Sequence, residues 1–223
     1  MSRIGLLFDL DGTLADTAPD LVGVLNRLLA ERGRAPMPYA IARNTVSHGA
    51  VGLIRLGFGL APGMPVDEDL RQRFLDLYIE RGHGHSRLFI ELETILSVCS
   101  RLGARWGVVT NKPAALTEPL LAVLGVLPSA EVVVSGDTLP QRKPDPAPLS
   151  LAARQLDVDP ASCIYIGDAE RDVIAGRAAG MRTVVTTYGY IRPSEAIASW
   201  QADALVDHPR KIEPMLLAMT GNR

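Results

Sequence analysis

The sequence predicts an α/β fold in which helices cover both faces of a parallel β-sheet. Short apolar runs rich in β-branched residues alternate with helical patterns through most of the 223-residue chain. The runs lie at 4–8, 105–110, 132–135, 163–167 and 183–186, and the helical patterns at 92–102, 116–124, 149–156 and 172–179. Buried strands separated by helices in this way are typical of βαβ units. Right-handed crossovers then bring the carboxyl ends of the strands to one edge.

Residues 18–86 break this alternation, because they contain helical patterns and no convincing strand. The patterns follow one another at 19–33, 41–56 and 67–81. Pro19 suits the first turn of a helix, and Gly33 suits a helix end. We therefore expect a helical cap, inserted into a Rossmann-like core. The expected division is a core of residues 1–17 and 87–223 and a cap of residues 18–86.

The composition is that of an ordinary globular protein, with 47% hydrophobic and 22% charged residues. The net charge is −2 and the basic residues are scattered, which argues against a nucleic-acid partner. No apolar run is long enough to span a membrane, and the stretch from Ile4 is cut by Asp9, so no signal peptide is expected. A cytoplasmic monomer or homodimer is the expectation. Cys99 and Cys163 lie inside apolar runs and are interpreted as packing residues.

The first strand ends in two acids. The segment after it reads FDLDGTLADT, which puts Asp9 and Asp11 one residue apart, just before Gly12. Glycine lets the backbone turn sharply there. Asp-Gly is also a common turn pair, so this motif alone has an ordinary structural interpretation. Two carboxylates this close repel one another, however, unless a cation or a proton lies between them.

The later strand ends are also polar. The run at 105–110 ends in Thr110 and is followed by Asn111, and the run at 163–167 is followed by Asp168 and Asp172 in GDAERD. Between them, Lys143 is the lone lysine of a proline-rich segment, RKPDPAPL. Each has an ordinary structural interpretation: Thr110 as a turn hydroxyl, Lys143 as a solvated surface residue and Asp168 as a helix N-cap. Because parallel strands end at one edge of the sheet, their coincidence predicts an active site there.

Together, these motifs resemble the haloacid dehalogenase superfamily, in its phosphatase branch with a helical cap. DLDGT at 9–13, Thr110, Lys143 and GDxxxD at 167–172 occur in the family's order. The resemblance covers nearly the whole chain and implies a phosphatase that hydrolyses small phosphate esters. Superfamily membership alone does not fix the reaction.

The resemblance also implies roles for these residues. Asp9 would attack phosphorus and form an aspartyl-phosphate, and Asp11 would act as general acid and then as general base. Thr110 and the Asn111 amide would hold phosphate oxygens. Lys143 would offset the negative charge of the nucleophile and the phosphate.

A Mg²⁺ cofactor is implied in the same way. Its protein ligands would be Asp9, the Asp11 carbonyl and Asp168, with a phosphate oxygen and waters completing the shell. Asp172 would orient these groups from outside the shell.

Four alternatives differ in what they require. A dehalogenase generally lacks the second acid, which is present here as Asp11. A phosphonate-cleaving relative needs a cap lysine, and residues 18–86 contain none. A sugar-phosphate mutase would share all four motifs and stays open. A non-catalytic phosphate-binding module is the alternative from another class, against which the complete motif set argues.

The substrate is less well defined by the sequence. SGDTLPQRKPDPAPL (135–149) is similar to phosphoglycolate phosphatases. AERG (30–33), WGVVTNKP (106–113) and the YGYI and WQAD stretches within 188–203 are more similar to N-acetylmuramic acid 6-phosphate phosphatases. In relatives, the loop corresponding to SHGA (47–50) faces the substrate, so Ser47, His48 and the Gly49 amide are candidate specificity contacts. A solvated helix-breaking turn is the alternative interpretation.

Overall fold

The computed structural model describes residues 3–220, and its centre is a six-stranded parallel sheet. The strand order is β5-β4-β1-β6-β7-β8. The strands are β1 (Gly5–Phe8), β4 (Arg105–Val109), β5 (Val132–Val134), β6 (Cys163–Gly167), β7 (Arg182–Thr186) and β8 (Ala204–Val206). The five predicted strands are confirmed to within one residue at each end. The chain adds strands on either side of β1, so the strand order changes direction there, where ligands of such sheets bind.

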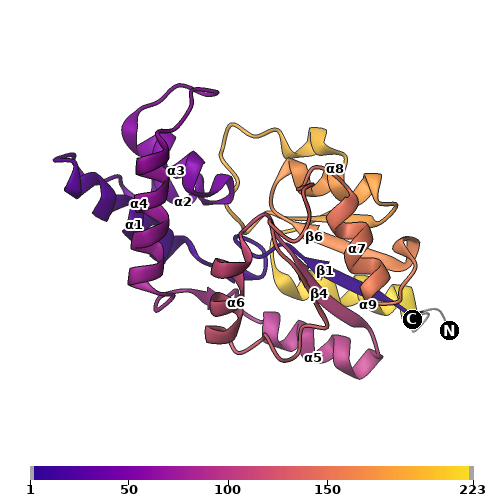
Figure 1. Cartoon of the computed structure of the whole chain (residues 1–223). Helices are drawn as coiled ribbons and strands as arrows, with labels where there is room; N and C mark the ends of the chain where they lie inside the picture. The colour runs from indigo at the N-terminus through magenta and orange to yellow at the C-terminus, as the bar shows by residue number, and fades with distance from the viewer. Residues whose placement is uncertain (1–2, 221–223) are drawn as a thin grey trace.

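Helices cover both faces of the sheet, as predicted (Figure 1). The core helices are α5 (Leu92–Leu102), α6 (Ala114–Val123), α7 (Ala147–Gln155), α8 (Glu170–Ala178) and α9 (Ile212–Thr220). In β1, Leu6 and Phe8 pack with α5, α6 and α9, while Leu7 packs with α7 and α8. This alternation follows from the strand geometry, in which successive side chains point to opposite faces.

The segment between residues 18 and 86 is helical and forms a second body beside the sheet edge (Figure 1). It contains α1 (Ala18–Glu31), α2 (Tyr39–Arg43), a 3₁₀ turn (Val46–His48), α3 (Gly49–Phe58) and α4 (Glu68–Arg81). These helices have their own apolar cluster, which includes Leu25, Leu28, Phe74 and Tyr78. This arrangement agrees with the expected helical cap. The exact boundaries of the cap, residues 18 and 86, remain a proposal.

Two features of this region differ from the expectation. The single helix expected at 41–56 is divided into α2, the 3₁₀ turn and α3, and the 3₁₀ turn ends at Gly49, whose φ of +64° a right-handed helix does not allow. The second feature is a two-stranded antiparallel ribbon, β2 (Ala15–Asp16) with β3 (Arg87–Leu88), which joins the insert to the sheet. Strands of two residues carry no periodic pattern, so the sequence did not predict them.

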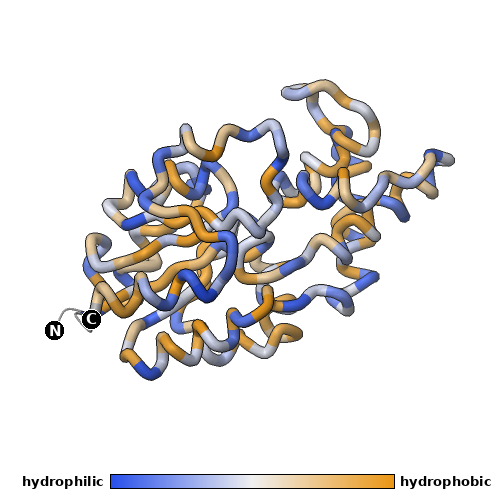
Figure 2. Tube along the Cα trace, turned by 180° about the vertical axis from the view of Figure 1, so that it is seen from behind, coloured by the Kyte–Doolittle hydropathy of each residue, from blue (hydrophilic) through white to orange (hydrophobic). Residues whose placement is uncertain are grey.

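The interior is filled by the apolar runs of the sequence. Figure 2 shows orange segments in the strands, and orange and blue alternating along the helices, as amphipathic helices require. Burial raises the pKa of Cys99 to about 12 and that of Cys163 to about 11, so both thiols are packing groups. Within residues 3–220, no helix is long and apolar enough to cross a membrane.

Candidate active site

Asp9 lies at the carboxyl end of β1, between the ends of the neighbouring strands. Its N–H continues the ladder to the Ile166 carbonyl of β6, at 2.8 Å. The side chain is buried, and its Oδ1 accepts a hydrogen bond from the Leu10 N–H, also at 2.8 Å. The carboxylate is therefore held in one orientation at the middle of the sheet edge.

Lys143 is the cation closest to this carboxylate. Its Nζ lies 2.9 Å from Asp9 Oδ1 and 2.8 Å from Asp172 Oδ1, and the side chain is completely buried. The ammonium also donates to the Val109 carbonyl at 3.0 Å and to the Tyr165 hydroxyl at 2.6 Å. Tyr165 was missed by sequence reasoning, because a tyrosine inside an apolar strand is indistinguishable from a packing residue.

Asn111 holds Lys143 in this place. Its side-chain amide donates to the Lys143 carbonyl at 2.9 Å and accepts the Lys143 N–H at 3.1 Å. Its neighbour Thr110 is buried and accepts the Lys112 N–H at 3.2 Å. The end of β4 and the proline-rich loop are thus joined across the site, although they are far apart in the sequence.

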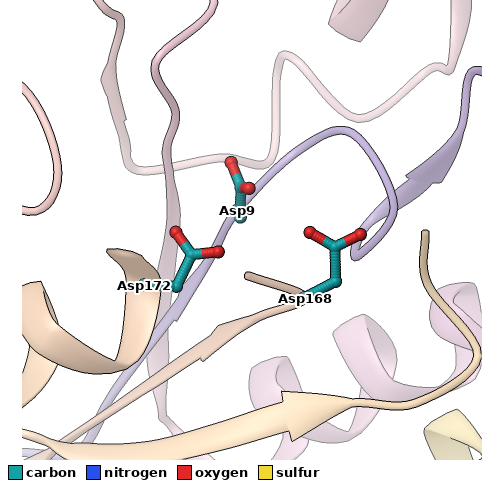
Figure 3. A group of neighbouring side chains, drawn as sticks. All are labelled: Asp9, Asp168 and Asp172. Atoms are coloured by element: carbon teal, nitrogen blue, oxygen red, sulfur yellow. The ribbon is translucent and has the colours of Figure 1, made fainter. Parts of the chain in front are cut away.

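Three buried carboxylates gather beside Lys143. One oxygen each of Asp9, Asp168 and Asp172 lie within 4.8 Å of one another (Figure 3). Asp168 Oδ1 is buried and has no hydrogen-bond partner among the described residues, whereas its Oδ2 accepts from Ser47 and Tyr190. A buried carboxylate oxygen without a donor, next to further carboxylates, suits a hard divalent cation. This group could therefore hold a metal ion.

The crowded charges shift the pKa values of these acids. Burial, together with the charges of Asp9 and Asp172, raises the pKa of Asp168 to about 7. Burial also raises the pKa of Asp9, against the opposing charge of Lys143. For Asp172, burial alone would raise the pKa, but the charges of Lys143 and Arg171 outweigh it and lower the pKa.

Gly12 fits this arrangement for a steric reason. Its φ is +85°, and a Cβ atom there would lie 2.0 Å from Asp168 Oδ2. Any larger residue would therefore displace one of the three carboxylates. The glycine expected from the Asp-Gly turn serves the site as well as the turn.

Asp11 does not belong to the group of three carboxylates and is held by other residues. Its Oδ1 accepts from the Thr17 hydroxyl at 2.6 Å and from Lys112 Nζ at 3.0 Å. Lys112 also donates to the Tyr78 hydroxyl of α4 at 3.0 Å. Burial alone would lower the pKa of Lys112, but the Asp11 charge outweighs it and raises the pKa. Lys112 follows the Thr110 motif, yet nothing in the sequence indicated that it would reach Asp11.

A cavity of about 370 Å³ lies between the strand ends and the helical segment. Asp9, Asp11, Thr110 and Asn111 line its inner end. Its outer wall is mainly apolar and comes from the helical segment and α6: Leu21, Val46, Val51, Phe74, Leu75 and Leu116. The cavity therefore joins a charged floor to an apolar wall.

The three residues predicted as specificity contacts all line this cavity. The Ser47 hydroxyl donates to Asp168 Oδ2 at 2.6 Å, so it contacts the carboxylate group directly. The His48 ring lies 3.4 Å from Glu195, and burial, with the nearby charges of Arg192 and Arg171, lowers its pKa. Gly49 is the residue at which the helical pattern breaks.

Comparison with known proteins places the chain in a family. A model of the haloacid dehalogenase-like hydrolases matches residues 6–186. The chain belongs to this family. It is 42% identical over 211 residues to an N-acetylmuramic acid 6-phosphate phosphatase of Pseudomonas aeruginosa, covering 95% of this chain and 93% of the relative. It is 40% identical to a phosphoglycolate phosphatase of Xylella fastidiosa, covering 92% and 89%.

Solved structures of this hydrolase family have the same fold. A predicted phosphoglycolate phosphatase from Haemophilus somnus superimposes with a TM-score of 0.83 at 25% identity, covering 96% of this chain and 98% of that one. CbbY from Rhodobacter sphaeroides, in complex with phosphate, gives a TM-score of 0.72 at 25% identity, covering 92% and 94%. The predicted α/β fold and the assignment to the phosphatases of the family are confirmed.

Proposed function

We propose that this hydrolase is a Mg²⁺-dependent phosphatase of small phosphorylated metabolites that works through an aspartyl-phosphate on Asp9. One observation carries the proposal: Asp9 lies at the charged end of a cavity, beside a buried lysine and two further buried carboxylates. Hydrolysis of a phosphate monoester needs an in-line nucleophile and positive charge around the phosphoryl group. This arrangement offers both.

The reaction proceeds in two displacements. A carboxylate oxygen of Asp9 attacks phosphorus, and the bond to the leaving oxygen breaks as Asp11 gives that oxygen a proton. Asp11 then takes a proton from a water molecule, which attacks the aspartyl-phosphate and releases phosphate and Asp9. Asp11 must first turn from Thr17 and Lys112 toward the leaving group, a rotation of one side chain.

The metal would be held by Asp9, the Asp11 carbonyl and Asp168, with Asp172 orienting the group through Lys143 and the Ala169 N–H. The unpartnered Asp168 oxygen supports this ligand set. When bound, Mg²⁺ neutralises part of the negative charge that the carboxylates and the phosphoryl oxygens bring together. Thr110 and the main-chain amide of Asn111, whose side chain is engaged by Lys143, would hold the phosphoryl oxygens at the same end of the cavity.

The relatives' names and the cavity suggest the leaving group. A cavity of about 370 Å³ falls within the range of small-molecule sites and exceeds what a two-carbon acid fills. Its apolar wall suits the methyl groups and ring of an N-acetylated sugar acid. We therefore place N-acetylmuramate 6-phosphate first among candidate substrates, as in the 42% identical relative, and 2-phosphoglycolate second.

Initial rates on a panel of phosphate esters test this function. The panel holds N-acetylmuramate 6-phosphate, 2-phosphoglycolate, several hexose phosphates and p-nitrophenyl phosphate, each with Mg²⁺ and with a chelator. We expect phosphate release that stops with the chelator and returns with added Mg²⁺. Isomerised sugar phosphate without phosphate release would favour a mutase, and no turnover of any ester would favour a binding module.

A further inference from the structure

Arg171 places a guanidinium group at the candidate active site, and none of the sequence motifs gives this residue a role. It belongs to α8 and directly precedes Asp172. Its Nη2 donates to the Ser47 carbonyl at 2.8 Å and lies 4.0 Å from Asp9 Oδ2. It lines the cavity together with Asp9. Its Nε is buried and has no hydrogen-bond partner among residues 3–220.

An unpaired buried N–H is costly, and native structures rarely keep one without a reason. Here the N–H belongs to a guanidinium that borders the cavity beside the nucleophile. Its natural acceptor is therefore a group that enters with the substrate. The planar fork of arginine matches the oxygens of a phosphoryl group, to which it makes short charge-assisted hydrogen bonds.

Lys143 is already engaged by oxygens of the protein in this structure. Its ammonium has three protons and four oxygen neighbours: Asp9 Oδ1, Asp172 Oδ1, the Val109 carbonyl and the Tyr165 hydroxyl. Its side chain is 0% exposed, and it does not line the cavity. The lysine therefore contacts one oxygen of Asp9 from within the protein, while Arg171 lies near the other oxygen and lines the cavity.

Three other cations line the cavity, and one of them, Arg142, is exposed and has no recorded ion pair with Asp9 among the described residues. Lys112 is engaged by Asp11 and Tyr78. Arg71 forks onto Glu68 on the outside of α4. Arg171 is the cation on the cavity for which the structure records an ion pair with Asp9.

We propose that Arg171 is a further catalytic residue, whose guanidinium binds the transferring phosphoryl group directly. Its bond to the Ser47 carbonyl at the same time ties the loop 47–50 to the reacting centre. The inference rests on the proposed phosphatase function. It adds Arg171 as a second cation at the phosphoryl group, beside the charge that Lys143 supplies at Asp9.

The test compares Arg171→Met and Arg171→Lys with Arg177→Met. Arg177 lies on the same helix, is exposed and donates to the Gln201 carbonyl, so it is a matched control for losing a guanidinium from α8. Three quantities are measured with Mg²⁺ present: kcat/KM on the best ester of the panel, kcat/KM on p-nitrophenyl phosphate, and the Kd of inorganic phosphate by calorimetry. Thermal unfolding of each variant shows that it is folded.

We expect Arg171→Met to lower kcat/KM about 10- to 100-fold on both esters and to weaken phosphate binding on the same scale, as for a lost hydrogen bond to a charged group. Arg171→Lys restores part of each loss, because the charge is kept without the fork. Arg177→Met stays within about twofold of the wild type, as expected for an exposed surface position.

Two results would overturn the inference while leaving the phosphatase intact. One is an unchanged Kd for phosphate in a folded Arg171→Met variant of an active wild type. The other is a loss confined to the larger ester, which would mean that Arg171 only positions the loop at Ser47. A wild type without Mg²⁺-dependent phosphatase activity would overturn the proposed function itself, and this inference with it.

Discussion

Asp9 is surrounded by groups that limit what its carboxylate can do. Lys143 and the Leu10 N–H engage Oδ1, while Oδ2 faces Arg171. Asp168 and Asp172 add negative charge within 4.8 Å. Without a cation, this crowding costs free energy of folding, because buried like charges repel. Under the proposed function, the chain gives up stability here for a reactive carboxylate.

Replacing Asp9 by asparagine tests the covalent mechanism. Asn is nearly isosteric but a very poor nucleophile, so Asp9→Asn should lower kcat by about 10³-fold or more. Its free energy of unfolding in chelator should equal or exceed that of the wild type, because one of three crowded carboxylates is gone. Residual activity at about a tenth of the wild type would rule out a covalent intermediate on Asp9.

Asp168 should serve the metal. We expect Asp168→Ala to raise the Mg²⁺ concentration needed for half-maximal activity by about tenfold or more, since one of few carboxylate ligands is lost. Calorimetric Mg²⁺ titration of the two proteins gives a readout independent of turnover. Activity lost with an unchanged Mg²⁺ requirement and an unchanged Mg²⁺ affinity would contradict the assignment.

At the scale of elements, α1 is tied to the chain returning from α4 by one buried carboxylate. Asp20, in the first turn of α1, accepts from the Ser86 hydroxyl at 2.8 Å and from the His85 N–H at 3.1 Å. His85 Nδ1 and Arg81 Nε lie within 3.3 Å of its other oxygen. Burial alone would raise the pKa of Asp20, but the hydrogen bonds of Ser86 and His85 outweigh it and lower the pKa.

This contact predicts a pH-dependent stability. We expect Asp20→Asn to lower the free energy of unfolding at pH 7 by about 1.5–3 kcal/mol, because an amide cannot accept from all these donors. A lowered folded pKa means that the stabilisation is present above the unfolded pKa, near 3.9, and is lost as the pH falls through the folded value. The difference in the free energy of unfolding between Asp20→Asn and the wild type should therefore become smaller below about pH 4.

Urea unfolding followed by circular dichroism at stepwise pH values between 7 and 3 measures this difference. Asp69→Asn is the matched control, because Asp69 is exposed in the first turn of α4. It should change stability by less than about 0.5 kcal/mol. A difference for Asp20→Asn that stays constant across the pH range would contradict the assignment.

At the scale of the whole molecule, we propose that substrate recognition is divided between the two sides of the cavity. The sheet edge supplies groups suited to a phosphoryl group, which every phosphate ester shares, while the helical segment supplies most of the wall around the leaving group. Closure of such a lid also excludes water from the reacting centre. The contacts of Ser47 with Asp168 and Arg171 show that the two sides meet in this structure.

This division predicts different outcomes for neighbouring residues. His48→Ala should lower kcat/KM for N-acetylmuramate 6-phosphate by a factor that corresponds to about 1–3 kcal/mol of transition-state free energy, the scale of a lost specific contact. It should change kcat/KM for p-nitrophenyl phosphate by less than about twofold. Ser47→Ala should lower both, because its hydroxyl supports Asp168. Parallel steady-state kinetics on the two esters measures this. Equal losses for His48→Ala would mean that it supports the catalytic groups.

The sequence by itself determined the fold class and the order of the motifs. Both depend on local patterns: β-branched runs give strands, and turn residues fix where they end. Because parallel strands end at one edge, Asp9, Lys143, Asp168 and Asp172 could be predicted to meet, and they do. Their chemical roles stay predictions. The β2–β3 ribbon was not predicted, because strands of two residues carry no measurable period, and β8 was not predicted either.

Only the tertiary structure decided which partners the charged groups take. Ser47 reaches Asp168 across 121 residues and Lys112 reaches Asp11 across 101, so no local pattern records either contact. The same holds for the contact of Tyr165 with Lys143 and for the place of Arg171 on the cavity. Each of these contacts requires two side chains to lie about 3 Å apart. That distance follows from how the helices pack on the sheet, and not from the spacing of residues along the chain.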